Sequence, residues 1–353
     1  MCSSSRQVAR CSAHPISKNI PLFQKVQKQV DNLSEFVSSL PALMKQVVVY
    51  TYASLGQTYV SSSEGRRAGW ALCAVNVAVW AAWQIPRLRP FMHIHFAHNP
   101  LSGKTYTMFT SIFSHASIIH LVFNCMALTS FASAAGNWMG HEQRSTSELQ
   151  EATEIYHFYA FFISAGLFSS LVSHVVSARF RFPRLVAQLA RKPPSEATAR
   201  TSVAATLTSS LTSVAKTPPP VTGAIAAAEA ATPAAAILPS LGASGAVYAS
   251  VILSALAFPN AEVSLVFPPT GSIPIGYGVG GLLLLDCVGA LRGWRIMDHY
   301  AHLGGAAFGV LYYAYGMQAW DATRVRLMGA TQQLKKWSSI ERPGSKGGNR
   351  TGA

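Results

Sequence analysis

Mostly apolar stretches alternate along the chain with polar, charged or proline-rich segments. The clearest stretch covers residues 68–86, which are flanked by arginine pairs on both sides and include three tryptophans. At a rise of about 1.5 Å per residue, a helix of this length nearly spans the ~30 Å hydrocarbon core of a bilayer, and tryptophan is enriched at membrane interfaces. The pattern therefore predicts a membrane-spanning helix over 68–86.

Similar stretches predict five further helices, at about 109–135, 155–178, 241–258, 274–291 and 296–317. The segment 40–60 is only moderately apolar and carries Lys45 together with several polar side chains. It leaves open whether an extra N-terminal membrane helix forms there. The expected fold class is an all-α polytopic membrane protein with a core of six helices.

The segments around these helices predict the organisation of the chain. Residues 1–30 are basic, contain several serines and have no acidic residue before Asp31. This composition is typical of a mitochondrial presequence, with a plastid transit peptide or an unstructured basic tail as alternatives. The predicted divisions are 1–64 (transit peptide and N-terminal region), 65–178 (core helices one to three), 179–239 (a disordered insertion rich in Ala, Pro, Ser and Thr), 240–320 (core helices four to six) and 321–353 (a basic polar tail).

Composition supports the membrane interpretation and narrows the candidate chemistry. Half of the residues are hydrophobic and 12% are charged, against about a quarter charged in soluble domains. The net charge of +14 comes mostly from the ends and the insertion, without the basic helix that a nucleic-acid surface needs. The five cysteines form no CxxC pair, and His93, His95 and His98 lack cysteine or carboxylate partners at ligand spacing. We predict no metal site and no cofactor.

Polar side chains inside apolar helices indicate where the chemistry lies, because an unpaired polar group in hydrocarbon costs several kcal/mol. His120 and Asn124 are four residues apart and share one helix face, as do Ser244 and Tyr248. His302 lies in the last predicted helix, before small residues that allow close helix packing. A serine in such a helix often only bonds back to a carbonyl one turn earlier. The other polar groups favour a catalytic interpretation of Ser244.

These residues together suit acyl transfer. Ser244 is the candidate nucleophile, and His302 is the candidate base, because a histidine takes up a proton near neutral pH. The side chains of His120 and Asn124 and the backbone N–H of Ser244 are candidate donors to the oxyanion. Tyr248 either stacks on the imidazole or belongs to the core.

With these residues in order on separate helices, the chain resembles the rhomboid intramembrane serine proteases, and most closely their mitochondrial, presenilin-associated rhomboid-like branch. The similarity covers roughly 65–317 apart from the insertion. The motifs that carry it are Gly242-Ala243-Ser244-Gly245 followed by Tyr248, His120-xxx-Asn124 with the upstream Phe113-Ser114-His115, and Ala301-His302-Leu303-Gly304-Gly305 with Gly309.

The resemblance implies a Ser244/His302 dyad and an oxyanion site formed by His120, Asn124 and the Ser244 amide. It implies supporting roles for the other motif residues, which are Tyr248, His115, Gly242, Gly245 and Gly305. Asp286, within the fifth helix, is a candidate third member of a triad. Because rhomboids work with a dyad, it is interpreted as structural or as a neighbour that modifies the pKa of the site. His299 is interpreted as interfacial.

The implied function is hydrolysis of peptide bonds in or near transmembrane segments of other proteins. The implied partners are single-pass membrane-protein substrates and the lipid bilayer, with no nucleic acid and no small-molecule cofactor. The implied location is the inner mitochondrial membrane, as a multi-pass protein. Two alternatives remain: a catalytically inactive relative that binds membrane clients, and a transporter, which would require repeat symmetry and interrupted helices that the sequence lacks.

Overall fold

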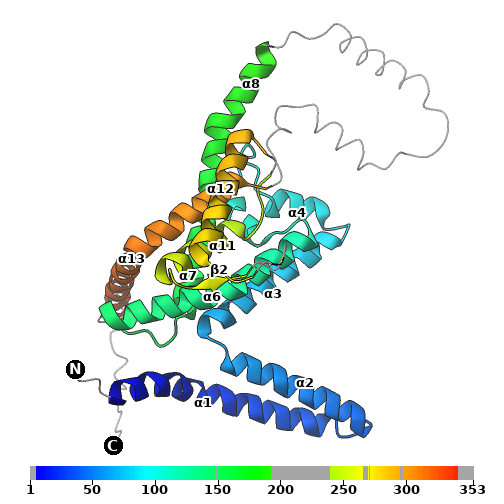
Figure 1. Ribbon diagram of the computed structural model, residues 1–353, viewed down its shortest axis with the longest axis vertical. Helices are drawn as coiled ribbons and strands as arrows, with labels where there is room; N and C mark the ends of the chain where they lie inside the picture. The colour runs from blue at the N-terminus through cyan, green and yellow to red at the C-terminus, as the bar shows by residue number, and fades with distance from the viewer. Residues whose placement is uncertain are drawn as a thin grey trace, which may run out of the picture.

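The computed structural model describes residues 5–147, 149–191, 239–264, 269, 271–294 and 297–340. Within these residues the protein is a helical bundle with one short two-stranded sheet (Figure 1). An N-terminal hairpin of α1 (Ser5–Phe36) and α2 (Ala42–Ser61) extends away from the bundle in Figure 1. The predicted all-α polytopic fold class is confirmed.

The bundle consists of longer helices with short elements at one end. The longer helices are α3 (Glu64–Gln84), α6 (Ile118–Thr146), α7 (Ile155–Val175), α11 (Ser244–Ala257), α12 (Ile275–Arg292) and α13 (His299–Ile340). The short elements are α4 (Arg89–Phe96), α5 (Thr107–Thr110), the 3₁₀ turn η1 (Ser111–Phe113), the π-helical turn η2 (Val176–Arg181) and α8 (Phe182–Arg191). The strands β1 (Glu262–Val263) and β2 (Ile273–Pro274) pair antiparallel just before α12.

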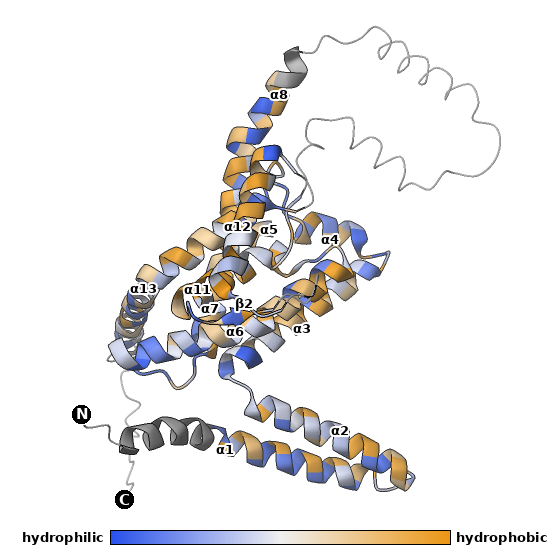
Figure 2. Ribbon diagram, in the orientation of Figure 1, coloured by the Kyte–Doolittle hydropathy of each residue, from blue (hydrophilic) through white to orange (hydrophobic). Residues whose placement is uncertain are grey.

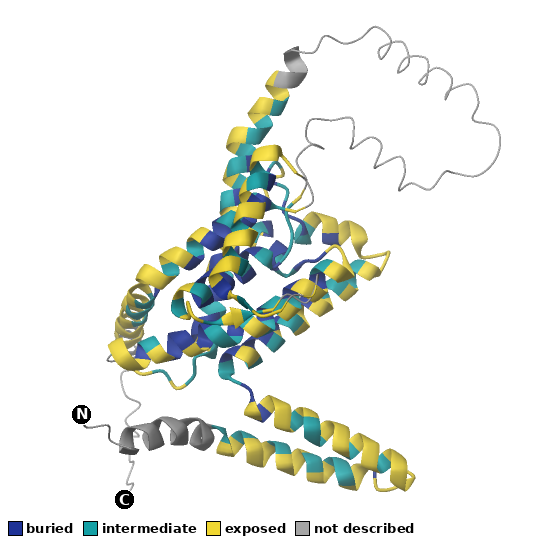
Figure 3. Cartoon of the chain, in the orientation of Figure 1, coloured by how far each residue is buried: buried dark blue, intermediate teal, exposed yellow. Residues whose placement is uncertain are grey.

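Helix α11 is the centre of the bundle. It packs against α13, α6 and α7, and Ala246, Ala249 and Leu253 are almost completely buried along it. Figure 3 shows that buried residues gather within the bundle, whereas the N-terminal hairpin is mostly exposed. In the described residues, three helices are both long and apolar enough to cross a membrane: α6, the continuous run Ile155–Ala187 and α12 (Figure 2). α11 is apolar but shorter, as expected for a helix enclosed by protein.

Small residues allow these helices to approach closely. A Cβ atom added to Gly305 of α13 would overlap the carbonyl oxygen of Gly245 on α11. Between α3 and α6, a Cβ on Gly136 would lie 2.9 Å from the Cα of Gly65. In hydrocarbon, such close van der Waals packing is a main source of helix association. The close approach of α11 to α13, and of α3 to α6, therefore requires glycine at these positions.

All six predicted core helices are present, but three of their boundaries were wrong. The second helix begins at Ile118 and not near 109, because Ser117 caps it by accepting a 3.2 Å hydrogen bond from the His120 amide. The third runs on through η2 and α8 to Arg191, where disorder was predicted from 179. The sixth extends to Ile340, well into the predicted polar tail.

The remaining predictions concern the two ends and the insertion. The segment 40–60 forms the helix α2, which is not one of the three helices named above as able to cross a membrane. Residues 5–30 of the predicted presequence lie in α1. The insertion lies outside the described residues from 192 to 238, as does the tail from 341 onward.

Candidate active site

Ser244 is the first residue of α11, and backbone contacts fix the segment that leads to it. The segment forms an antiparallel bridge in which the amides of His98 and Ser240 each donate to the other residue's carbonyl at 2.9 Å. The amide of Gly242 donates to the carbonyl of Ser111 at 2.9 Å. Gly242 has φ +131°, a conformation that only glycine adopts readily. The strain-free turn at Gly242 therefore directs the chain into α11.

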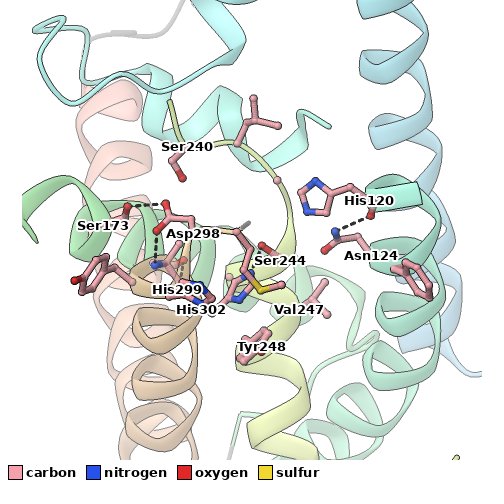
Figure 4. A pocket seen from close by; sticks show the side chains of 18 of the residues that line it. His120, Asn124, Ser173, Ser240, Ser244, Val247, Tyr248, Asp298, His299 and His302 are labelled. Carbon is pink, nitrogen blue, oxygen red and sulfur yellow. Dashed lines mark hydrogen bonds between the residues drawn. The ribbon is translucent and has the colours of Figure 1, made fainter. Parts of the chain in front are cut away.

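The serine contacts the histidine predicted as its base. Ser244 Oγ lies 2.9 Å from His302 Nε2, within hydrogen-bond distance. The ring of Tyr248 stacks on the imidazole of His302, with centroids 4.4 Å apart and an interplanar angle of 14°. Tyr248 lies one turn after Ser244 on α11, which brings its ring against His302 (Figure 4). The stacked tyrosine ring limits rotation of the imidazole.

A buried carboxylate contacts His302 on the side of the ring that faces away from Ser244. Asp286 of α12 is fully buried, and its Oδ1 lies 3.1 Å from His302 Nδ1. The same Oδ1 accepts from His299 Nδ1 at 2.7 Å, and Oδ2 accepts from the hydroxyl of Tyr248. Hydrogen bonds to both oxygens stabilise a carboxylate that would otherwise be costly at this depth. The chain thus places Ser244, His302 and Asp286 in a line of hydrogen bonds.

The interpretation of His299 as interfacial was wrong. The residue is 3% exposed, and its Nδ1 contacts Asp286. The cause is the packing of α12 on α13: Gly289 leaves room for the imidazole, and any Cβ there would overlap the His299 ring. The sequence signal that could have found this contact is a lone carboxylate and a nearby glycine in an otherwise apolar helix.

His120 and Asn124 reach the site from α6 and lie opposite Ser244 in Figure 4. A Cβ on Gly242 would lie 2.7 Å from His120 Cε1 and 3.7 Å from Ser244 Oγ, so the ring and the hydroxyl flank this glycine. One N–H of the Asn124 amide donates to the His120 carbonyl at 2.8 Å. The amide carries a second N–H.

His115 was predicted on the second helix, but it lies before α6 because that helix begins at Ile118. It is completely buried, and its Nε2 accepts a 3.4 Å hydrogen bond from the amide of Ala243. Its ring meets that of His120 edge-on, with centroids 5.1 Å apart. His115 therefore supports both the chain before Ser244 and the ring of His120.

The three histidines of the first loop point to separate partners. His93 packs edge-on against Trp83, and His95 Nδ1 lies 2.7 Å from the Tyr106 hydroxyl. The third, His98, is buried, and burial lowers its pKa to about 4, with a further lowering from neighbouring His174.

The tautomer of His98 follows from its neighbours, Thr107 and His174. Thr107 donates its hydroxyl to the Lys104 carbonyl at 2.5 Å, so it accepts from His98 Nδ1 at 2.8 Å. The neutral ring then accepts at Nε2 from His174 Nδ1, 3.1 Å away. Sequence spacing could not reveal this pair, because its members lie on segments far apart in the chain.

Ser244 and His302 open into a cavity of about 1040 Å³. His120 and Asn124 line one wall, and Ser169 and Ser173 of α7 line another. Apolar side chains of α6 and α12, among them Phe123, Val279 and Leu282, complete the lining. The cavity could hold an extended peptide segment and water beside the serine hydroxyl.

Comparison with known proteins shows the family of this chain. The family model described as Rhomboid domain matches residues 102–189 and 197–319, together more than half of the chain. The chain is 28% identical over 312 residues to presenilin-associated rhomboid-like protein A, mitochondrial, from Danio rerio, covering 88% of this chain and 63% of that protein.

Two further proteins with rhomboid names are similar to this chain. The chain is 28% identical over 289 residues to the presenilin-associated rhomboid-like protein, mitochondrial, of Mus musculus, covering 82% of this chain and 57% of the relative. It is 25% identical over 267 residues to rhomboid protein 1, mitochondrial, of Saccharomyces cerevisiae, covering 74% and 56%. The chain spans about three fifths of the length of these relatives. The protein therefore belongs to the rhomboid family and is a multi-pass mitochondrial membrane protein.

Proposed function

We propose that this rhomboid is an active intramembrane serine endopeptidase that uses Ser244 and His302 as a catalytic dyad. The observation that carries the proposal is the 2.9 Å contact between Ser244 Oγ and His302 Nε2, both of which line the cavity. A serine hydroxyl becomes an effective nucleophile when an adjacent base takes its proton. The second nitrogen of His302 faces Asp286, which leaves Nε2 free to act as that base.

The reaction has two halves. In the first, Ser244 Oγ attacks the scissile carbonyl carbon while its proton passes to His302 Nε2. Collapse of the tetrahedral oxyanion breaks the C–N bond, and His302 gives the proton to the leaving amine. In the second, a water gives a proton to His302 and attacks the acyl ester. Ser244 leaves with that proton, and the product is a carboxylic acid.

The developing oxyanion is held by donors on two elements. Ser244 is the first residue of α11, where backbone N–H groups have no intrahelical partner. His120 and the second N–H of the Asn124 amide approach from α6. Each donor aimed at an oxyanion is worth about 10²–10³ in rate. The two groups on α6 are thus electrostatic contributors and not bases.

The substrates we propose are single-pass membrane proteins of the inner mitochondrial membrane. A substrate helix hides its carbonyls in intrahelical hydrogen bonds, so it must unwind to present one to Ser244. The cavity has room for an unwound segment, and the serines of α7 give its wall a polar side for water. Helix-weakening residues near the cut should therefore favour cleavage.

An active-site label tests the proposal directly. The full chain, purified in detergent, is treated with a fluorophosphonate and assayed on a single-pass model substrate. We expect phosphonylation of Ser244, located by mass spectrometry, with loss of cleavage in proportion to labelling. Cleavage that persists at full labelling would overturn the dyad. A folded protein that neither labels nor cleaves would instead indicate an inactive relative that binds membrane clients.

Replacing Asn124 or His120 with alanine is expected to lower kcat by about 10²–10³-fold. KM should stay within about threefold of the wild-type value, because an interaction made only in the transition state leaves substrate binding unchanged. Initial rates on the model substrate over a range of concentrations separate the two constants. Ser130→Ala is the matched control, since this exposed serine on α6 only donates to the Met126 carbonyl. A rise in KM alone would assign the two residues to substrate binding.

A further inference from the structure

Asp286 is the only charged group of α12 that lies against the proposed dyad in the described part of the chain. Its carboxylate lies within hydrogen-bond distance of three side chains on two other helices: Tyr248 of α11, and His299 and His302 of α13. It contacts His302 at Nδ1, the nitrogen that faces away from Ser244. A carboxylate in this place fixes the tautomer of a catalytic histidine and stabilises the imidazolium formed during reaction.

Helix α12 has few other attachments. Only Ile275, Asp286 and Gly289 are buried along it, while Leu284 is 65% and Leu291 is 87% exposed. Asp286 and Gly289 are three residues apart and share one face. Gly289 lies against the His299 ring. One helical turn, with the carboxylate at its centre, therefore attaches α12 to α13.

The same helix also forms a wall of the cavity. Gly278, Val279 and Leu282 of α12 line it, as do Phe123 and Asn124 of α6. Asp286 is on α12 and His302 is on α13, so their contact depends on the packing of α12 against α13.

We propose that Asp286 is a positioning residue for His302, and that it makes the dyad competent only while α12 is docked against α11 and α13. The inference rests on the proposed protease function and deepens it. His299 and Tyr248 hold the carboxylate in place through their own hydrogen bonds.

Three variants test the positioning role by kinetics on the model substrate. Asp286→Asn keeps the side-chain volume and should lower kcat by about 10²–10⁴-fold, as loss of the acid does in serine-protease triads. KM should change by less than about threefold. Tyr248→Phe and His299→Gln should each lower kcat less, because two of the three side chains that contact the carboxylate remain in each. Asp286→Glu should restore part of the loss, and Leu284→Ala, an exposed change on α12, should leave kcat unchanged.

A second measurement reports the position of α12 without relying on activity. Spin labels are attached at Leu284→Cys of α12 and Val310→Cys of α13, both exposed in the structure, in a background without the native cysteines. The distance distribution should be narrow with Asp286 present, and it should broaden toward longer distances with Asp286→Asn. Unfolding temperatures of all variants show which of them are folded.

Two results would overturn the inference: a wild-type kcat in folded Asp286→Asn, or an unchanged distance distribution. Different results would refute the protease proposal itself. In that case the wild-type protein does not cleave, or Ser244→Ala cleaves as well as wild type. The inference can therefore fail while the proposed function stands.

Discussion

Ser244→Ala is expected to abolish cleavage of a transmembrane substrate while the protein stays folded. Removing the nucleophile of a serine protease costs about 10⁶ in kcat. The hydroxyl of Ser244 contacts His302, whereas the turn before it is held by backbone bonds at Ser240 and Gly242. The variant should therefore keep the wild-type unfolding temperature. Gel-based cleavage and thermal unfolding in the same detergent check both statements.

The chain offers a matched control on the same helix. Ser250 is also buried in α11, but its hydroxyl donates to the Ala246 carbonyl at 3.1 Å. Ser250→Ala should keep cleavage within about twofold, because such back-bonding contributes little. His302→Ala should be as inactive as Ser244→Ala, and the double variant no worse, because the two residues act as a unit. Comparable activity in Ser244→Ala and wild type would refute the dyad.

Gly305→Ala is expected to destabilise the bundle strongly. The added Cβ would overlap the Gly245 carbonyl oxygen, so α11 and α13 would have to separate. Overpacking a tight core costs about 1–3 kcal/mol and occasionally more. We expect the upper part of this range, because the atom that the Cβ meets belongs to a helix backbone and cannot rotate away. Separation would also lengthen the Ser244–His302 contact, so activity should fall with stability.

Thermal unfolding in detergent measures this effect. Gly329→Ala is the matched control on α13, because a Cβ at Gly329 meets no atom within 4 Å. Alanine has a higher helix propensity than glycine, so the control should be neutral or slightly stabilising. Equal unfolding temperatures for the two variants would contradict close packing at Gly305.

Hydropathy was sufficient to predict the six core helices, because burial in lipid or protein demands apolar runs of helix length. It was insufficient to predict where they begin or end. The apolar residues 108–113 continue the pattern of the second helix, yet Ser117 caps that helix at Ile118. A helix cap depends on a single side chain, and the continuation of the third helix to Arg191 depends on local packing. A hydropathy average over many residues detects neither.

The shared face of Ser244 and Tyr248 was predictable because spacing within a helix fixes which residues lie together. The pairing of Ser244 with His302 was predicted from the chemistry of the two side chains and from the resemblance to the rhomboid motifs. Contacts between helices carry no such signal. Asp286, His299 and Tyr248 come from three places in the sequence, and no local pattern brings them together.

The bridge between His98 and Ser240 has a mechanical consequence. A tension applied to the chain ahead of Ser240 would be borne by paired backbone hydrogen bonds to the first loop, and not by the turn at Gly242. The position of Ser244 is therefore insensitive to a pulling force from the chain that precedes Ser240. This insensitivity lets the connection between α8 and α11 differ in length without shifting the nucleophile relative to His302.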